Sequence, residues 1–230
     1  YQHRRHREVE TFFSWCRRMG YVKENAFARV PLVKRPQRIK PPFSPDEVGR
    51  LLASLDRRRH SGSRNFALVL FLLDTGVRAS ECIGVDVKDV DWEAGRVLIR
   101  HGKGDKQRWV GIGDRTVEAL RAYLSDFRGH SAGALFRTTF GAAMASPGTL
   151  EVLLRRLAER CGLQHVHPHR FRHTFATWAI ESGAREIDVQ LLLGHSDLTM
   201  TQHYARTYTT EQAIRAHADL SPVRRLAVSP

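Results

Sequence analysis

Apolar residues recur at helical spacing along most of the chain. Near the start, five apolar side chains fall on one face at intervals of three and four, which predicts a helix ending near Gly20 (Val9, Phe12, Phe13, Cys16 and Met19). The segment Ser44-Pro45-Asp46-Glu47 then offers an N-cap, a proline for the first helical position and a capping-box glutamate. A second helix is therefore expected to begin there.

Later segments complete the pattern. The stretch "NFALVLFLLDTG" (65–76) predicts a helix that stops at Gly76, because glycine adopts the left-handed conformation at little cost. The stretch "RVLIRHGKGDKQRWVGI" (96–112) alternates, breaks at Gly-Lys-Gly-Asp and resumes, which predicts a β-hairpin with a basic tip. Further helices are expected around 114–127, 147–160, 170–182, 185–193 and 210–219. The fold class is therefore mainly α with a small antiparallel β-sheet (α+β).

A proline-rich segment separates the first helix from the rest. The segment "PLVKRPQRIKPPFSP" (31–45) has five prolines among its cations, and each proline opposes helix continuation. We expect an extended linker and a domain boundary near residue 40. About 40 residues with one long helix do not make a self-sufficient core. Residues 1–40 are thus predicted to be the C-terminal remnant of an α-helical domain plus a basic linker, followed by a larger domain (41–220) and a C-terminal tail (221–230).

Composition narrows the class of protein. The 230 residues are 42% hydrophobic, which suits one or two globular domains. No stretch approaches the roughly 18 consecutive apolar residues of a membrane span. The start "YQHRRHREVE" has neither a signal peptide's apolar core nor an initiator Met, so we expect the chain to begin inside a longer protein. The net charge of +13 favours a polyanionic partner such as nucleic acid, the alternative being a basic surface without a partner.

The cysteines indicate a reducing compartment. Cys16, Cys82 and Cys161 form an odd, widely spaced set without a CxxC pair. Neither a disulfide framework nor a cysteine zinc site is suggested, and the cytoplasm fits best.

Two short segments place a cation where an anion could bind. In "TGVRASEC" (75–82), Arg78 follows a helix-ending glycine and precedes another helical start, where backbone N–H groups and the helix dipole favour negative charge. Glu81 can orient Arg78, although a purely structural ion pair is the alternative. At the hairpin tip "GKGDK" (102–106), Lys103 can project into a groove or simply be solvated.

The segment "HPHRFRHTFAT" (167–177) concentrates cations on a predicted helix. If the helix begins near Pro168, then His169, Arg172 and His173 share a face while Arg170 points elsewhere. His169 and His173 have zinc-ligand spacing, but the accompanying glutamate is missing and two arginines would repel a dication. A phosphate fits better, because arginine binds its oxygens bidentately and histidine can accept a proton.

A candidate nucleophile lies further along, in "LLLGHSDLTMTQHYART" (191–207). Gly194 ends an apolar helix, His195 begins the next turn, and Tyr204 follows nine positions later. Tyr208, one turn further, is the competing tyrosine. A tyrosine in a helix most often packs half-buried, but beside a phosphate site it can act as a nucleophile.

Four segments taken together carry a family resemblance. "TGVRASE", "GKGDKQR", "HPHRFRHTFAT" and "LLGHSDLTMTQHY" closely resemble, in order and spacing, the motifs of the tyrosine recombinase (phage integrase) family. The likeness runs from about residue 43 to 210. Residues 1–40 look like the end of that family's core-binding domain, although Asn25-Ala26 stands where the family often has Asn-Pro. The resemblance implies a site-specific recombinase with the family's catalytic-domain fold, cutting and rejoining DNA through a 3′-phosphotyrosyl intermediate without metal or ATP.

The resemblance also implies a complete catalytic set. It comprises two arginines that clamp the scissile phosphate, a lysine that protonates the leaving 5′-oxygen, a histidine that helps take the tyrosine proton, a residue at the family's His/Trp position, and the nucleophile (Arg78 and Arg172, Lys103, His169, His195 and Tyr204, respectively). Glu81 matches the acidic residue that supports the first arginine. Further DNA contacts are predicted for five basic residues (Arg35, Arg38, Lys40, Lys106 and Arg170).

The resemblance extends to partners and setting. It implies double-stranded DNA, a homotetramer on two DNA sites, no membrane, and a nucleoid-associated cytoplasmic location in a bacterial or phage-like context, with integration, excision or resolution of mobile elements as roles. The tail 221–230 is expected to pack on a neighbouring copy or to fray. The alternatives are a type IB topoisomerase-like or telomere-resolving enzyme and a non-cleaving DNA-binding regulator. A metal-dependent nuclease is disfavoured, because no carboxylate cluster with metal-ligand spacing stands out.

Overall fold

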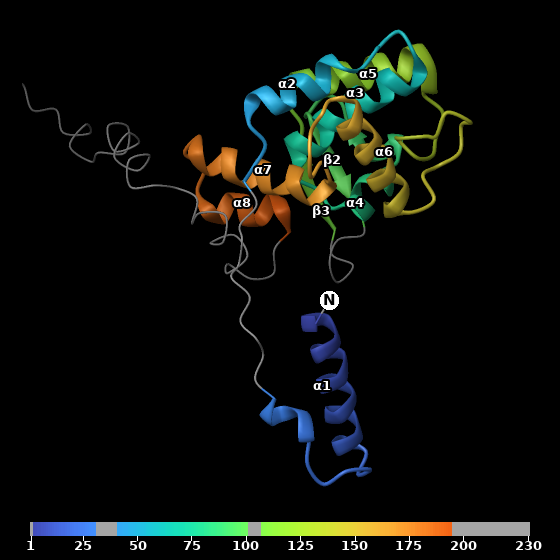
Figure 1. Cartoon of the computed structure of the whole chain (residues 1–230). Helices are drawn as coiled ribbons and strands as arrows, with labels where there is room; N and C mark the ends of the chain where they lie inside the picture. Colours follow the sequence, from blue (N-terminus) through green and yellow to red (C-terminus); the bar gives the residue numbers. More distant parts are fainter. Residues whose placement is uncertain (1, 31–40, 101–106, 195–230) are drawn as a thin grey trace, which may run out of the picture. The chain divides into compact units, whose positions relative to one another are not determined.

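The chain divides into two compact units between residues 40 and 41 (Figure 1). The computed structural model describes residues 2–30, 41–100 and 107–194. Among the helices of these residues, none has the length and apolarity that crossing a membrane requires.

The first unit is one helix with a capped turn. Helix α1 (Gln2–Arg18) is followed by the 3₁₀ turn η1 (Ala26–Arg29), and Asn25 accepts a hydrogen bond from the Phe27 N–H while its amide donates to Ser14 Oγ at 2.9 Å. The predicted helix is confirmed, but its apolar face is only partly covered. Cys16 is buried, whereas the Phe12 side chain is exposed.

The second unit is mainly helical with one small sheet, as predicted. Its elements are α2 (Pro45–Ala53), α3 (His60–Thr75), α4 (Ala79–Ile83), η2 (Val87–Asp89), β1 (Val90–Asp91), β2 (Arg96–Ile99), β3 (Arg108–Gly111), α5 (Asp114–Tyr123), η3 (Leu124–Arg128), α6 (Pro147–Arg160), α7 (Pro168–Glu181) and α8 (Glu186–Leu193). The strands form an antiparallel sheet in the order β1-β2-β3, and the hairpin register pairs Ile99 with Arg108. The hairpin tip and the helix expected at 210–219 lie outside the described residues.

Helix boundaries follow their capping residues. Ser44 and Glu47 form the expected capping box at the start of α2, with the Glu47 N–H donating to Ser44 Oγ at 3.1 Å. Helix α3 ends at Gly76 as predicted, but it begins earlier, at His60. The added turn is polar in sequence, yet Gly62, Ser63 and Arg64 are buried, and the Arg64 guanidinium donates to Asn65 Oδ1 and to the Arg137 carbonyl.

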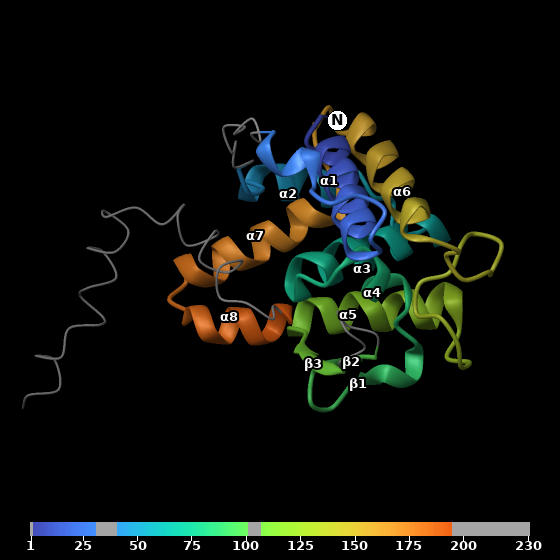
Figure 2. The same ribbon diagram turned by 90° about the horizontal axis from the view of Figure 1, so that it is seen from below.

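Helix α3 lies at the centre of the core. Its side chains are buried nearly all round, and it packs against both α5 and α7. Helix α8 lies beside α7, and its C-terminal end reaches β3 (Figures 1 and 2). The end of α3, the start of α4, strand β3 and the end of α8 therefore meet in one region of the molecule.

Candidate active site

The turn after α3 sets the direction of the first arginine. Gly76 has φ +59°, and an added Cβ would lie 2.7 Å from side-chain atoms of both Leu193 and Phe175. Only glycine permits this approach, because any side chain would be both strained and blocked. The chain turns here so that Arg78 becomes the N-cap of α4.

Arg78 and Glu81 form the expected pair at the start of α4. The Arg78 backbone N–H donates to Glu81 Oε2 at 2.8 Å, and its Nη1 donates to Oε1 at 2.7 Å. Glu81 is thus bound through both oxygens to one residue. Its side chain is only 1% exposed, whereas that of Arg78 is 30% exposed.

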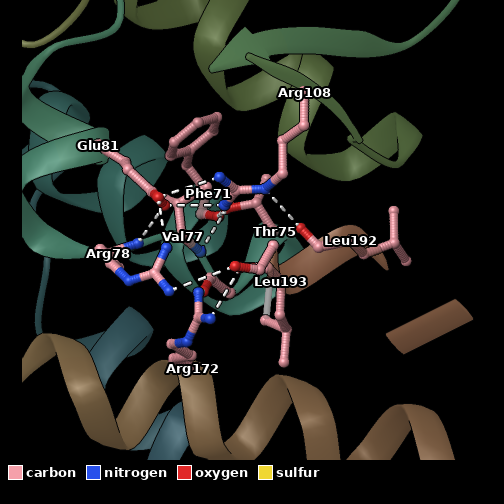
Figure 3. Close-up of polar contacts among 11 residues, drawn as sticks. Phe71, Thr75, Val77, Arg78, Glu81, Arg108, Arg172, Leu192 and Leu193 are labelled. Carbon is pink, nitrogen blue, oxygen red and sulfur yellow. Dashed lines mark hydrogen bonds and ion pairs between the residues drawn. The ribbon is translucent and has the colours of Figure 1, made fainter. Parts of the chain in front are cut away.

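A second arginine, which the motif comparison did not single out, shares the same carboxylate (Figure 3). Arg108 of β3 donates from Nη1 to Glu81 Oε1 at 3.0 Å and from Nη2 to Oε2 at 2.8 Å. The sequence did contain a signal. Arg108 and Val110 are two residues apart in the strand, so they share a face, and Val110 is buried. A charge on a buried face requires a partner. The position of that partner depends on the tertiary fold.

The electrostatics of Glu81 follow from these contacts. Burial by itself would raise the pKa of Glu81, but the hydrogen bonds and charge of Arg108, together with the hydrogen bonds of Arg78, outweigh it and lower the pKa to about 2. Glu81 is therefore ionised at neutral pH. It keeps both guanidinium groups in fixed positions.

Arg172 of α7 is buried between the C-terminal ends of two helices. Its Nη1 donates to the Gly76 carbonyl at 2.9 Å and its Nη2 donates to the Leu193 carbonyl at 2.8 Å. The side chain therefore connects the C-terminus of α3 to the C-terminus of α8.

Successive carbonyls at the end of α8 accept from three different arginines. The pairs are Leu192 with Arg108 Nε at 2.9 Å, Leu193 with Arg172 Nη2 at 2.8 Å, and Gly194 with Arg78 Nη2 at 3.5 Å (Figure 3). The last carbonyls of a helix have no intrahelical partner and carry the negative end of its dipole. The arginines thus satisfy the end of α8 and fix it beside Glu81.

Two of these arginines also line a hollow of about 500 Å³. Arg78 and Arg172 are joined there by the exposed His169 from the first turn of α7; the other lining residues are Val77, Ala79, Glu151, His167 and Pro168. The charged side chains of this lining are Arg78 and Arg172 against Glu151, which leaves an excess of one positive charge with the histidines neutral. The arrangement suits a phosphate-sized anion.

A larger hollow, of about 650 Å³, lies elsewhere on the same unit. Its lining mixes three acidic residues with three arginines (Asp56, Glu118 and Asp126 with Arg57, Arg58 and Arg115). Because those charges balance, size alone does not identify the functional site.

His173 does not join this set. It is buried, and its Nδ1 lies 3.4 Å from Thr177 Oγ1, although its spacing on the helix predicted a face shared with His169 and Arg172. In the described part of the chain, no three His, Cys, Asp or Glu side chains are grouped as a metal site would need.

The structure places Arg170, one of the predicted DNA contacts, inside the second unit. Its buried Nη2 donates to both oxygens of Glu47, at 2.8 and 3.0 Å, while its Nε donates to the Pro41 carbonyl. The guanidinium also lies over the Phe43 ring, 4.0 Å from the centroid. Its donors thus hold the segment that enters α2, which leaves the side chain buried inside the unit.

Several predicted site residues lie outside the described residues. They are the hairpin and C-terminal members of the catalytic set, the competing tyrosine and four basic residues (Lys103, His195, Tyr204, Tyr208, Arg35, Arg38, Lys40 and Lys106). Their assignments stay predictions.

Comparisons with known proteins agree on one family. The model of the phage integrase family matches residues 42–211. Over 215 residues the chain is 37% identical to the tyrosine recombinase XerC of Anoxybacillus flavithermus, an alignment that covers 90% of this chain and 70% of that protein.

Solved structures give the same answer at the level of the fold. The crystal structure of XerA recombinase is similar with a TM-score of 0.67 and 26% identity, covering 94% of this chain and 83% of that one. The Tn1549 transposon integrase, in complex with a circular intermediate DNA, has a TM-score of 0.78 at 20% identity, covering 95% and 78%. The latter likeness concerns the fold alone.

Proposed function

The chain belongs to the phage integrase family and is a tyrosine-type site-specific recombinase, and on this premise we propose that its arginine-lined hollow is where DNA is cut and rejoined. The observation that carries the proposal is the convergence of Arg78 and Arg172 with His169 on one hollow. These residues come from α4 and α7, so the fold itself brings them together. Neither the topoisomerase-like nor the regulatory alternative is favoured by this membership.

The two arginines would bind the non-bridging oxygens of the scissile phosphate. Arg78 is oriented by Glu81, and Arg172 is fixed by the carbonyls of Gly76 and Leu193. Neither guanidinium must reorganise when negative charge builds up in the pentacoordinate transition state. A preorganised donor of this kind typically contributes about 3 kcal/mol, roughly a hundredfold in rate.

The reaction follows from the roles carried over from the family. The Tyr204 oxygen attacks phosphorus, its proton passes to His169, and the bond from phosphorus to the 5′-oxygen breaks as Lys103 donates a proton to that oxygen. The products are a 3′-phosphotyrosyl enzyme and a free 5′-hydroxyl. His195 would donate to a non-bridging oxygen. The reverse attack by a 5′-hydroxyl rejoins the strand, and because the bond energy is conserved in the intermediate, ATP is not required.

Double-stranded DNA is the partner that this chemistry requires. Phosphate contacts are assigned to the linker and the hairpin, through Arg35, Arg38, Lys40 and Lys106, in keeping with the net charge of +13. Residues 1–40 would be the end of a core-binding domain. We assign the working assembly as a tetramer on two DNA sites in the bacterial cytoplasm, at the nucleoid.

The test is covalent trapping on a nicked suicide DNA substrate that cannot be religated. Wild-type protein in EDTA should give a protein–DNA band on denaturing gels. Tyr204→Phe should abolish the band and Tyr208→Phe should retain it. Loss of the band only with Tyr208→Phe would move the nucleophile to Tyr208, and tight, salt-sensitive binding without any band would indicate a non-cleaving DNA-binding protein instead.

A further inference from the structure

Arg108 differs from the two arginines of the hollow in what it faces. Its side chain is only 12% exposed, and it is not part of the hollow's lining. All three contacts of its guanidinium that are described above are to protein acceptors: the two oxygens of Glu81 and the Leu192 carbonyl. Direct contact with a phosphate in the hollow is therefore not its role.

We propose that Arg108 is a positioning residue for the recombination reaction. Its guanidinium fixes the Glu81 carboxylate beside Arg78, and it also fixes the end of α8 beside that carboxylate. This inference rests on the function proposed for the hollow. The hairpin would then contribute two residues to cleavage: the lysine at its tip acts directly, and Arg108 on its strand acts indirectly.

The carboxylate of Glu81 is shared between Arg78 and Arg108 in a defined geometry. Oxygen Oε1 of Glu81 accepts from Nη1 of both arginines, and Oε2 accepts from the Arg78 N–H and from Arg108 Nη2. The planar guanidinium of Arg108 meets both oxygens at once, which fixes the plane of the carboxylate. Without Arg108, a buried carboxylate would have Arg78 as its remaining cation here. It would then draw the Arg78 side chain toward itself and away from the hollow.

Arg108 also contacts the end of α8. Arg108 Nε donates to Leu192, and a Cβ added at Gly194 would lie 3.1 Å from the Cδ, Nε and Nη1 atoms of Arg108. The backbone at the end of α8 therefore lies directly against this side chain. The chain continues from Gly194 into His195 and, nine residues later, Tyr204.

Arg108 is also close in sequence to the hairpin tip. It is the first residue of β3, five residues after Lys103 of the hairpin tip. One side chain is thus connected to the strand that follows the proposed general acid, to the carboxylate behind Arg78, and to the helix that precedes the proposed nucleophile. A small displacement of a reacting group costs on the order of 100-fold in rate, so such a connection has kinetic consequences.

The experiment separates positioning from binding and from folding. Rates of covalent-complex formation on the suicide substrate are measured at saturating DNA, and DNA affinity is measured separately by gel shift. Arg108→Gln should slow the covalent step about 10- to 100-fold while affinity changes little. Arg108→Lys should recover part of the rate, because it restores the charge but cannot reach both Glu81 oxygens and Leu192.

A double-mutant cycle identifies the path of the effect. Glu81→Gln combined with Arg108→Gln should be about as slow as the slower single variant, because both changes disrupt one unit. The matched control is Arg128→Gln, since buried Arg128 donates only to carbonyls of the loop 129–134 in the contacts described. This control should lower the melting temperature and leave the covalent step at the wild-type rate.

Clear results would overturn the inference. The inference is overturned if the Tyr204-dependent band forms at the wild-type rate in Arg108→Gln. It is also overturned if the rate reductions of the two single variants multiply in the double variant. If Arg108→Gln does not fold, Arg108→Lys decides, and a wild-type rate there counts against positioning. Absence of any Tyr204-dependent band in the wild type would instead refute the function proposed for the hollow, and this inference with it.

Discussion

Replacing Glu81 by glutamine removes the charge that Arg78 and Arg108 share while nearly preserving the shape of the side chain. The folded-state pKa of Glu81 is about 2, against an ordinary value of 4.5. At about 1.4 kcal/mol per pH unit, this difference corresponds to roughly 3 kcal/mol of stabilisation at neutral pH. Because the side chain is only 1% exposed, little of this is lost to solvent screening. Glu81→Gln should therefore lower the free energy of unfolding at pH 7 by about 3 kcal/mol.

The pH dependence has a definite direction. The pKa of Glu81 is lower in the folded than in the unfolded state, so its stabilisation is fully present above pH 4.5 and is lost as the pH falls through about 2. The difference in unfolding free energy between wild type and Glu81→Gln should thus shrink on acidification. It should be roughly half its neutral value at pH 3.

The assay is urea unfolding followed by circular dichroism at pH 7, 5 and 3. The control variant is Glu118→Gln, because the Glu118 side chain is exposed and its change should have an effect within about 0.5 kcal/mol at each pH. An unfolding free energy for Glu81→Gln within about 0.5 kcal/mol of the wild type at pH 7 would show that the shared charge does not stabilise the fold. A large difference that stays constant down to pH 3 would show that the loss comes from packing and not from the charge.

Three further substitutions probe other parts of the site. Gly76→Ala should lower the free energy of unfolding by about 1–2 kcal/mol because of the left-handed backbone, and by more because of the contacts with Leu193 and Phe175. The melting temperature should fall, and an unchanged melting temperature would contradict this. Arg172→Lys should slow covalent-complex formation on the order of 100-fold in a single-turnover assay, because lysine lacks the fork that reaches both carbonyls and a phosphate, whereas a wild-type rate would exclude the clamp. Arg170→Gln should destabilise the fold by about 3 kcal/mol and leave the salt dependence of DNA affinity unchanged, and a slope reduced by about one would restore Arg170 as a phosphate contact.

Local signals made much of the fold predictable from sequence. The capping box at Ser44 and Glu47 and the terminator at Gly76 are each set by neighbouring residues, so the ends of α2 and α3 follow from the chain itself. The two-residue strand β1 is too short to show alternation. The first turns of α3 include Arg64, whose guanidinium donates to the carbonyl of the distant Arg137, and no local pattern reports such a contact.

The candidate site shows the same division. Arg78 and Glu81 lie three residues apart at one helix start, so their pairing was predictable. Arg108 lies far along the chain and meets Glu81 only once β3 has packed beside α4 and α8, so the motif alone did not reveal it. Helical spacing correctly placed Arg170 on a different face from Arg172. The residues that Arg170 contacts on that face are Glu47 and Phe43, which come from a distant segment of the chain.

The amino acid that carries the DNA in the covalent complex can be identified directly. The covalent complex trapped on the suicide substrate would be digested with nuclease and protease, and the modified peptide sequenced by mass spectrometry. We expect a nucleotide 3′-phosphate on Tyr204, with the yield strongly reduced by Arg78→Ala and by Arg172→Ala. A nucleotide on any other residue, or an undiminished yield without the two arginines, would contradict it.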